Sequence, residues 1–362
     1  MEANLMTSRI VIALIVVSSV CSCGGDQVTT PEQPIHERGL HEVGAMTRPR
    51  YEHAATLLQS GKVLIAGGTT ELPPAGGGIY RPEGLVSAEI FDPETGISTP
   101  TGDLTVGSTE GRGILLPDGR VLMVIDLGGF SIEMYDPHSG RFDDVATLPW
   151  RVLTETATIL PNGEVFLTSK RYAGVFDPTK GAFSATLRMY PSRGAHTATL
   201  LKDGRVLIVG GSISPGGWMI GLNLFYDPST GAFSEAGHMQ FDRALHKAVL
   251  LQDGRVLIVG GIDAPVPYED WPQVKTAEIY DPETNTFSPA GTSGIWPSAA
   301  LLLPSGRVFF IHWDNGKIVL YNPETQAFSP TGHSIGPWRR GATATLLDDG
   351  RVVIAGGLKW SD

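Results

Sequence analysis

Pairs of short apolar segments recur along the chain, and a polar turn containing glycine separates the two members of each pair. In HTATLLKDGRVLIVGG (196–211), for example, two strands flank Asp203-Gly204. Such self-similarity at a regular period indicates a repeat architecture built from β-hairpins. Seven copies align by eye, and they start at His53, Arg112, Thr156, His196, His246, Ala299 and Thr343.

The turn inside every copy carries a small polar residue followed by glycine. Glycine tolerates positive φ angles, and a polar residue before it is a strong hairpin signal, so each copy predicts a two-residue hairpin. The pairs are Ser60-Gly61, Asp118-Gly119, Asn162-Gly163, Asp203-Gly204, Asp253-Gly254, Ser305-Gly306 and Asp349-Gly350.

A third and a fourth strand follow the hairpin. The fourth has the form AFSEAGHM (232–239), and the third ends in an aromatic residue, Asp or Asn, and Pro. The Asp or Asn side chain caps a turn, and the proline fixes the φ angle at the next position of that turn. The alternative is that these acidic residues form a ring of metal ligands. Turn capping is favoured, so we expect no metal and no cofactor. The triplets are Phe91-Asp92-Pro93, Tyr135-Asp136-Pro137, Phe176-Asp177-Pro178, Tyr226-Asp227-Pro228, Tyr280-Asp281-Pro282 and Tyr321-Asn322-Pro323.

Short, evenly spaced strands in units that cannot bury both faces alone predict an all-β fold, a seven-bladed β-propeller with strands a to d in each blade. Here the chain resembles kelch repeats of the galactose oxidase central-domain type. In that family Arg-x-x-His opens strand a, Gly-Gly closes strand b and Tyr-Asp ends strand c. The resemblance covers about residues 39 to 357. The matching doublets are Gly67-Gly68, Gly210-Gly211, Gly260-Gly261 and Gly356-Gly357.

The two ends of the repeat region complement one another. Residues 39–46 (GLHEVGAM) match a strand d that no strands a to c precede, and the last copy stops shortly after strand b. We therefore expect the N-terminal strand to join the C-terminal blade and close the ring, which removes free sheet edges. Strand c of that blade is missing. Either the blade has three strands, or residues 31–38 replace it, or the natural chain is longer.

The first residues predict an export signal. Residues 10–17 (IVIALIVV) follow Arg9 and suit the core of a signal peptide, being too short to span a membrane. The segment VCSCGG (20–25) resembles a bacterial lipoprotein box with Cys23 as the lipidated residue; an ordinary secretory signal or a short anchor is the alternative. This gives a lipoprotein signal peptide at 1–22, a tether at 23–38 and the propeller at 39–362.

This organisation predicts a membrane-anchored lipoprotein of the cell envelope, periplasmic or surface-facing. Cys21 and Cys23 are the only cysteines of the sequence, so the predicted propeller domain has no disulfide and no thiol nucleophile. The formal net charge is −11 and no basic run occurs. Because phosphate binding needs clustered Lys and Arg, nucleic acid is excluded as a partner. We expect a monomer whose partner is an envelope protein, a peptide or a glycan.

Successive strands of a blade are antiparallel, so the a–b and c–d turns lie on one face of the disc and the b–c and d–a connections on the other. We call these the turn face and the loop face. Long connections on a rigid scaffold are where binding usually occurs, and they are all predicted on the loop face. They are residues 69–86, residues 212–221 with Trp218, and residues 262–276 with Tyr268, Asp270 and Trp271.

The starts of the inner strands are expected around the channel mouth on the loop face. Arginine and aromatic side chains there would fit carboxylates, sugar acids or an acidic peptide. Alternatively, each Arg-x-x-His pair belongs to the repeat itself and hydrogen-bonds loop carbonyls. The candidate ligand-binding residues are Arg50, His53, Glu110, Arg112, Asp126, Arg151, Glu155, Lys170, Arg193, His196, Arg243, His246, Trp296, His312, Trp313 and Arg340.

Three blades lack the Gly-Gly doublet, and Ile125-Asp126, Ser169-Lys170 and His312-Trp313 stand in its place. Asp126, Lys170 and His312 would add titratable groups near the channel mouth, with simple drift of the repeats as the alternative. Because glycine relieves a tight backbone, these three blades are expected to curve differently there.

No catalytic signature is found in the sequence. Galactose oxidase-like copper enzymes join a cysteine to a tyrosine and use a Tyr-His pair, and the repeat region has neither, so that activity is not expected. Residues 36–41 (HERGLH) miss the spacing of a zinc-protease motif, and no nucleophile elbow, phosphate loop or dinucleotide fingerprint occurs.

We therefore expect no catalytic residues and a binding or interaction module that acts through the loop face. The alternative is a periplasmic carbohydrate-active enzyme similar to kelch-type sialic acid mutarotases, with Glu110 or Glu155 and a histidine in proton transfer. A structural module of a larger surface assembly is a further alternative, because a fold alone does not carry a function.

Overall fold

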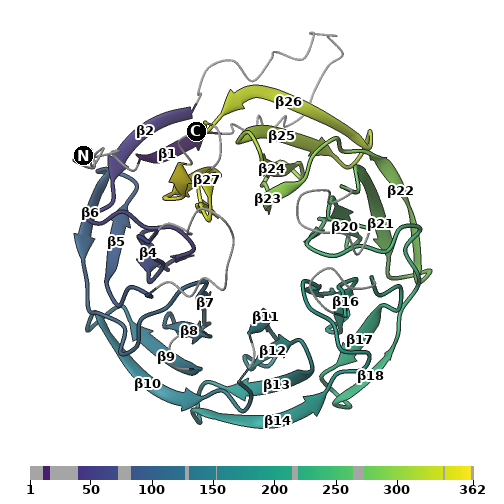
Figure 1. Cartoon of the computed structure of the whole chain (residues 1–362), viewed down its shortest axis with the longest axis horizontal. Helices are drawn as coiled ribbons and strands as arrows, with labels where there is room; N and C mark the ends of the chain where they lie inside the picture. The colour runs from purple at the N-terminus through teal and green to yellow at the C-terminus, as the bar shows by residue number, and fades with distance from the viewer. Residues whose placement is uncertain are drawn as a thin grey trace, which may run out of the picture.

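The computed structural model describes residues 11–16, 40–71, 83–126, 130–151, 153–213, 219–263, 273–336 and 339–359. In this part of the chain every regular element is a β-strand. Antiparallel four-stranded sheets stand around a common axis as the blades of a β-propeller (Figure 1). The described residues contain no helix of the length and apolarity that a membrane crossing requires.

Six blades follow one another along the chain, each from four consecutive strands a to d with strand a innermost (Figure 1). Blade 1 comprises β3 (Ala54–Leu57), β4 (Val63–Ala66), β5 (Ala88–Asp92) and β6 (Ile97–Pro100). Blade 2 comprises β7 (Arg112–Leu115), β8 (Val121–Ile125), β9 (Ser131–Asp136) and β10 (Arg141–Thr147). Blade 3 comprises β11 (Thr154–Ile159), β12 (Val165–Ser169), β13 (Tyr172–Asp177) and β14 (Ala182–Arg188).

The second half of the ring repeats the same plan. Blade 4 comprises β15 (Thr197–Leu200), β16 (Val206–Val209), β17 (Leu224–Asp227) and β18 (Ala232–Glu235). Blade 5 comprises β19 (Lys247–Leu250), β20 (Val256–Val259), β21 (Thr276–Asp281) and β22 (Thr286–Thr292). Blade 6 comprises β23 (Pro297–Leu302), β24 (Val308–His312), β25 (Lys317–Asn322) and β26 (Ala327–Ser334).

The remaining strands bring both ends of the chain together. β28 (Thr343–Leu346), β29 (Arg351–Ala355), β1 (Val11–Val16) and β2 (Leu40–Ala45) pair antiparallel in that order, and we call them the terminal group. A parallel bridge between Ala45 and Ile97 joins β2 to β6, which makes one eight-stranded sheet with blade 1. β27 (Arg339–Arg340) and β30 (Leu358–Lys359) form a separate pair.

Residues 11–16 therefore occupy the position of strand c in the terminal group, between β29 and β2. The sequence pattern assigns the same residues to a signal peptide, and a mature chain that begins at Cys23 would lack this strand. Residues 31–38, which were the other expected source of strand c, lie outside the described residues. The count of seven closed blades stays a prediction.

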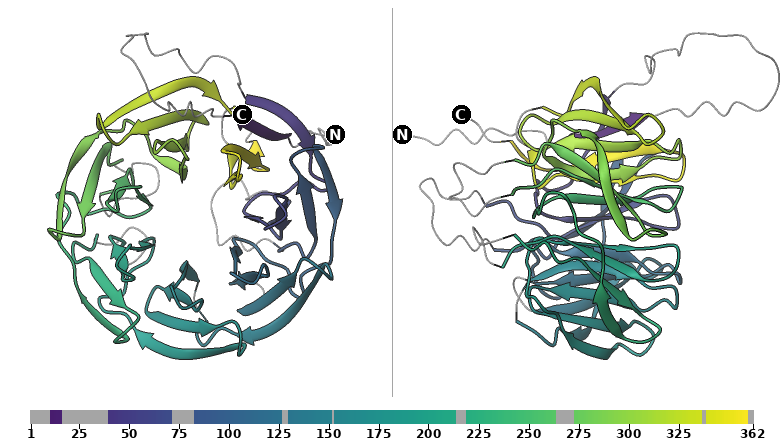
Figure 2. Two further views of the ribbon diagram at one scale, coloured as in Figure 1. Left: turned by 180° about the vertical axis from the view of Figure 1, so that it is seen from behind. Right: turned by 90° about the vertical axis from the view of Figure 1, so that its right-hand side faces the viewer.

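The core lies between neighbouring blades. Strand b is completely buried in β4, β8, β16 and β20, because it is covered on both faces. The inner strands β7 and β15 are half-buried along their whole length although they lie nearest the axis. Solvent therefore reaches these inner strands. Figure 2 shows the disc from behind and from the side.

The a–b turns differ in size from the predicted two-residue hairpins. In blade 1 the Leu58 amide donates to Lys62 O (2.8 Å) and the Gly61 amide donates to Leu58 O (2.9 Å), so the loop has three residues. Only the glycine takes a positive φ (77°). This is the pattern of a type I turn closed by a glycine bulge, which needs one left-handed residue instead of two. The prediction of turn positions is confirmed, and that of turn type is wrong.

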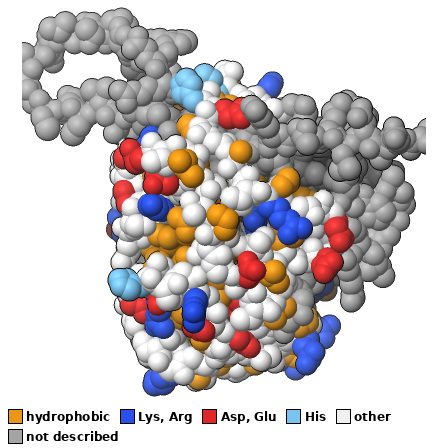
Figure 3. Space-filling model, turned by 90° about the vertical axis from the view of Figure 1, so that its left-hand side faces the viewer, with side chains coloured by type: hydrophobic (Ala, Val, Ile, Leu, Met, Phe, Trp, Pro, Cys, Tyr) orange, Lys and Arg blue, Asp and Glu red, His pale blue; other side chains and the backbone are white. Residues whose placement is uncertain are grey.

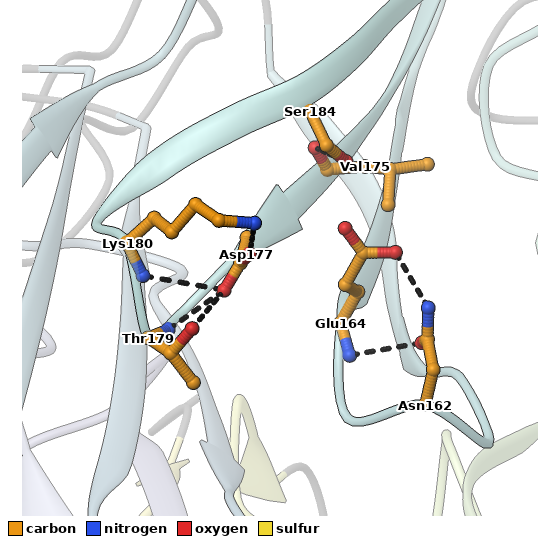
Figure 4. A network of polar contacts seen from close by, with 7 residues as sticks. All are labelled: Asn162, Glu164, Val175, Asp177, Thr179, Lys180 and Ser184. Atoms are coloured by element: carbon orange, nitrogen blue, oxygen red, sulfur yellow. Dashed lines mark hydrogen bonds and ion pairs between the residues drawn. The ribbon is translucent and has the colours of Figure 1, made fainter.

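The Asp-Pro triplets cap the c–d turns. Asp177 Oδ1 accepts hydrogen bonds from the amides of Thr179 (2.9 Å) and Lys180 (3.2 Å), and Lys180 Nζ lies 2.6 Å from Asp177 Oδ2 (Figure 4). The Lys180 ammonium and the Thr179 hydroxyl hold the pKa of this carboxyl well below its usual range. The turn-capping interpretation is confirmed, because equivalent bonds to an amide two residues on are made by Asp92, Asp136, Asp227, Asp281 and Asn322.

Glycines on the outer strands allow neighbouring blades to approach closely. The Gly102 amide donates to Gly140 O of the next blade (2.9 Å), and a Cβ on Gly102 would collide with that oxygen. A Cβ on Gly237 would meet the carbonyl of Asn285 in the same way. Gly44 of β2 stands against Gly96 of blade 1 in the same arrangement. The outer wall around this joint carries charges of both signs among apolar side chains (Figure 3).

Candidate binding face

The three Arg-x-x-His arginines lie inside the blades. Arg50, Arg193 and Arg243 are at most 2% exposed. Arg243 Nη1 donates to the carbonyls of Gly260 (3.2 Å) and Thr276 (2.9 Å), and Arg193 Nη1 donates to Gly210 O and Leu222 O. Arg50 makes the equivalent bonds to Gly67 O and Ser87 O. These side chains fasten strand b to the start of strand c, so the structure does not bring them to the channel mouth.

The histidines of the same motif link neighbouring blades. His246 Nε2 lies 2.9 Å from Thr197 Oγ1 in blade 4, and His53 Nε2 lies 2.9 Å from Thr343 Oγ1 in the terminal group. His196 Nε2 reaches Thr168 Oγ1 of blade 3 at 2.7 Å. Burial lowers the pKa of His53 and of His196 to about 3, so both rings are neutral at pH 7. These histidines serve as latches between blades.

Buried glutamates on strand c complete this framework, and the sequence patterns do not single them out. Glu278 Oε1 lies 2.5 Å from Arg243 Nη2, and Oε2 accepts the Gln240 amide (2.7 Å). Glu133 accepts bonds from the Thr105 and Val106 amides. Each carboxylate ties down the connection that enters its own blade. Fully buried charges with such partners are structural elements of the repeat.

Two cations face the axis where the latch is absent. Arg112 and Lys247 begin β7 and β19, six residues before the Asp of their a–b turns, where Thr197 stands in blade 4. Arg112 donates to the backbone carbonyl of Glu155 in blade 3 through Nη2 (2.9 Å) and Nε (3.2 Å). Lys247 was missed by the sequence analysis, although its place in the repeat could have revealed it.

The charges of Arg112 and Lys247 act on one another across the ring. Burial lowers the pKa of Lys247, and the Arg112 guanidinium lowers it further, although blades 2 and 5 are not neighbours. Lys247 forms no ion pair with a residue in the described ranges. Arg112 and Lys247 therefore lie within electrostatic reach of one another near the axis.

Acidic candidates lie beside Arg112. Glu155 Oε2 accepts the Ala195 amide (2.9 Å) and Asp126 Oδ1 accepts the Thr154 amide (2.9 Å). Burial raises the pKa of both carboxyls. Asp126 is buried between blades 2 and 3, whereas Glu155 is half-buried and Glu110 is exposed. Of these three, Glu155 and Glu110 remain accessible near the axis.

The aromatic candidates form a pair on blade 6. The rings of Trp296 and Trp313 stack with centroids 5.4 Å apart, and both are half-buried. The neighbouring His312 is also half-buried, and its Nδ1 accepts the Asp314 amide (3.1 Å). Burial lowers the pKa of His312. Of Arg340 only the backbone is described. Trp218, Tyr268, Asp270 and Trp271 lie outside the described residues, as does Cys23.

The blades without Gly-Gly differ in backbone as expected. In the doublets both glycines have positive φ, for example 62° at Gly210 and 100° at Gly211. No residue of the three replacing pairs has a positive φ. Strands β8, β12 and β24 each run on to the first residue of the replacing pair, with five residues against four in β4, β16 and β20. The prediction that these blades differ here is confirmed.

Most of the exposed large hydrophobic residues lie on the loop face. Of the eight in the described residues, seven lie in b–c or d–a connections or at a strand end beside them, and only Ile97 lies on the turn face. Tyr190 is 84% exposed. The loop-face set is Val86, Leu153, Tyr172, Tyr190, Ile213, Phe241 and Leu245.

The turn face has the opposite character. Its arginines pair with the Asp two residues earlier in the a–b turn, as Arg120 does with Asp118 (2.7 Å) and Arg205 with Asp203 (2.6 Å). A hollow of about 540 Å³ lies between blades 1 and 2, but Lys62 and Tyr135 on its wall already contact Asp92 and Thr101. The polar groups of this face are largely used by one another.

Comparison with known proteins supports the fold. Residues 243–293 match the Kelch motif, which lies in blade 5 and the connection that enters it. A fungal alcohol oxidase of the AA5 family in complex with copper is similar in structure, with a TM-score of 0.63 and 13% identity, over 88% of this chain and 81% of that one. A comparison with curated protein sequences gives no significant match.

A second similar structure is a catalytically inactive virginiamycin B lyase from Staphylococcus aureus with quinupristin. Its TM-score is 0.60 at 12% identity, over 87% of this chain and 98% of that one. At such identities the likeness shows the fold alone. The described residues hold no group of three or more His, Cys, Asp or Glu side chains that could bind a metal ion.

Proposed function

We propose that this Kelch-repeat β-propeller is a binding module that engages a protein partner through its loop face. The observation that carries the proposal is the placement of exposed hydrophobic residues, seven of eight on that face. Exposed apolar side chains on a rigid scaffold mark interaction surfaces when they gather on one side. Kelch propellers commonly act as protein-interaction modules, which agrees with this assignment.

Capture of a partner from the native cell extract by the immobilised protein tests the proposal. Ile213 is 49% exposed on the loop face and Ile97 is 60% exposed on the turn face, so Ile213→Ser and Ile97→Ser form a matched pair. The captured protein should be reduced with Ile213→Ser and retained with Ile97→Ser, and adding Phe241→Ser to Ile213→Ser should abolish capture. Equal retention by both would contradict the proposal.

We propose further that the ring has seven blades and that β2 closes it as strand d of the terminal group. Two observations support this. The inner strand β28 contacts β3 of blade 1, and His53 reaches Thr343 as His246 reaches Thr197 between blades 5 and 4. Gly44 also meets Gly96 as Gly102 meets Gly140.

The anchoring of the protein is proposed on the sequence alone. Lipidation at Cys23 with a tether to residue 38 would hold the propeller at an envelope membrane. Fractionation of cells that produce the protein tests this: wild type is expected in the membrane fraction, and Cys23→Ala should appear in the soluble fraction. Membrane association of Cys23→Ala would refute the lipoprotein assignment.

An enzyme acting on a sugar acid is the second candidate, and one observation favours it. Glu155 is a half-buried carboxyl whose pKa burial raises, and it lies beside the Arg112 guanidinium. A general acid near a cation that fixes a carboxylate is the arrangement such chemistry needs. Turnover of a sialic or uronic acid that is lost with Glu155→Gln would favour this candidate over the binding module.

A further inference from the structure

Blade 3 presents four basic side chains on the loop face, and of these Lys170 lies within electrostatic reach of the Glu155 carboxylate. Arg151, Arg171 and Arg188 are exposed, and Lys170 is half-buried. None of the four forms an ion pair with a described residue. The whole chain has a formal net charge of −11, so a local excess of cations is unusual. The arginines of the turn face differ from these four, because they pair with Asp.

The four cations belong to one continuous strip. Tyr172 stands opposite Arg188 in the β13–β14 ladder, and Lys170 and Arg171 precede it directly. The ring of Trp150, next to Arg151 in sequence, stacks on Tyr172 with centroids 6.4 Å apart and planes 7° apart. The d–a connection is fastened alongside, because the Met189 amide donates to Arg171 O (2.9 Å) and the Arg193 amide to Lys170 O (2.8 Å).

The strip runs radially from the rim of the disc toward its axis. Arg188 ends the outermost strand β14, Tyr172 starts β13 and Lys170 follows β12, while Arg151 follows Trp150, whose ring stacks on Tyr172. We call Arg151, Lys170, Arg171, Tyr172 and Arg188 the blade 3 strip. Strands lie about 4.8 Å apart, so the strip spans about 10 Å from β14 to β12. An extended peptide covers that distance with about three residues.

We propose that the blade 3 strip binds an extended acidic segment of a protein partner. Guanidinium groups bind carboxylates through bidentate hydrogen bonds. Tyr and Arg are also enriched among the residues that contribute most to binding at protein interfaces. Tyr190, 84% exposed in the same d–a connection as the Met189 bond, adds an aromatic contact at the rim. The inference rests on the proposed function, since it names the chemistry of the partner.

Fluorescence anisotropy with a labelled hexaglutamate peptide and the full-length protein tests this at 50 mM and 300 mM NaCl. Wild type should bind hexaglutamate and not hexaglutamine, with weaker binding at the higher salt. The double variant Arg171→Gln/Arg188→Gln should weaken binding by about tenfold, because two exposed charge pairs are lost. Lys275→Gln/Lys317→Gln is the matched control on the loop face of blades 5 and 6, and it should change binding by less than about twofold.

Two outcomes would overturn the inference. One is that hexaglutamate does not bind, or that it binds the Arg171→Gln/Arg188→Gln variant as tightly as the wild type. The other is tighter binding of hexagalacturonate, an acidic sugar that also carries six carboxylates, when that binding depends on the same arginines. Failure here leaves the proposed function testable, since Ile213 and Phe241 lie in the b–c connection of blade 4 and in the d–a connection to blade 5, outside the strip. Loss of the captured protein with those variants and no hexaglutamate binding would reject the strip alone.

Discussion

At the scale of single residues, the Arg-x-x-His motif illustrates what a residue pattern leaves open. The pattern placed Arg243 and His246 at the start of an inner strand, and the structure has them there. It did not tell whether the donors point to solvent or into the blade. That choice follows from carbonyls at the end of strand b and the start of strand c, and from Glu278, which are remote in sequence.

The latch histidines predict a loss of stability in acid. The pKa of His196 is about 3 in the folded protein, against about 6.5 when unfolded, so the unfolded chain binds more protons between these values. The contribution of His196 is therefore fully present above about pH 6.5 and is lost as the pH falls below it. Urea unfolding should show that His196→Gln removes about 2 kcal/mol of the wild-type decrease in unfolding free energy between pH 7 and pH 5. An unchanged pH dependence would contradict the buried neutral ring.

Arg243 should matter for stability far more than Arg171. Replacing Arg243 by Met leaves the carboxylate of Glu278 buried without its cation, which should cost about 3 to 5 kcal/mol of unfolding free energy. Arg171→Met changes an exposed side chain and should stay within about 0.5 kcal/mol. Denaturant titration measures both. Adding Glu278→Gln to Arg243→Met should restore part of the loss, and similar small effects of both single changes would refute the structural role.

At the scale of elements, the apolar and turn pattern predicted the strand positions well, because each blade is fixed by local signals. The pattern left the assignment open where one segment satisfies two patterns. Residues 11–16 are apolar, follow a basic residue and suit both a signal peptide and a buried strand, so sequence alone favoured the former. The blade 3 strip also escaped notice as a unit, because Arg151, Arg171 and Arg188 come from three separate connections or strand ends.

The outer glycines give a test of how the elements join. Gly102→Val and Gly44→Val each place a side chain against a backbone carbonyl of the adjacent blade, and each should cost about 1 to 3 kcal/mol. Ala182→Val, at an exposed position of β14, is the control and should be nearly neutral. The unfolding free energies from denaturant titration decide the matter. A neutral Gly44→Val beside a costly Gly102→Val would mean that β2 is not held against blade 1.

At the scale of the whole molecule, the resemblance to kelch repeats and the repeat count led to a propeller, and the described residues form one. The repeat also predicted that the turn face carries tight turns and the loop face the long connections. It could not predict which apolar side chains of these connections stay exposed. Only burial in the assembled disc separates Ile213 and Tyr190, which stay exposed, from apolar residues that the neighbouring blade covers.

Ring closure is the prediction that involves the whole chain. Deleting residues 31–48 removes β2 and leaves the outer edge of the terminal group and of blade 1 without a partner, so cooperative stability should fall. A loss of about 5 kcal/mol would lower the melting temperature by roughly 10 °C in a domain of this size. Replacing residues 31–36 with Gly and Ser keeps β2 and should leave the melting curve unchanged.

Leu14→Pro separates the two N-terminal strands in the same assay. Leu14 lies opposite His41 and Val353 in the backbone ladders, and proline has no N–H to donate there. If β1 is part of the mature ring, Leu14→Pro should lower the melting temperature as the deletion does. If only the deletion lowers it, the ring closes through β2 without residues 11–16, as removal of the predicted signal peptide requires. An unchanged melting curve for the deletion itself would refute closure by the N-terminal strand.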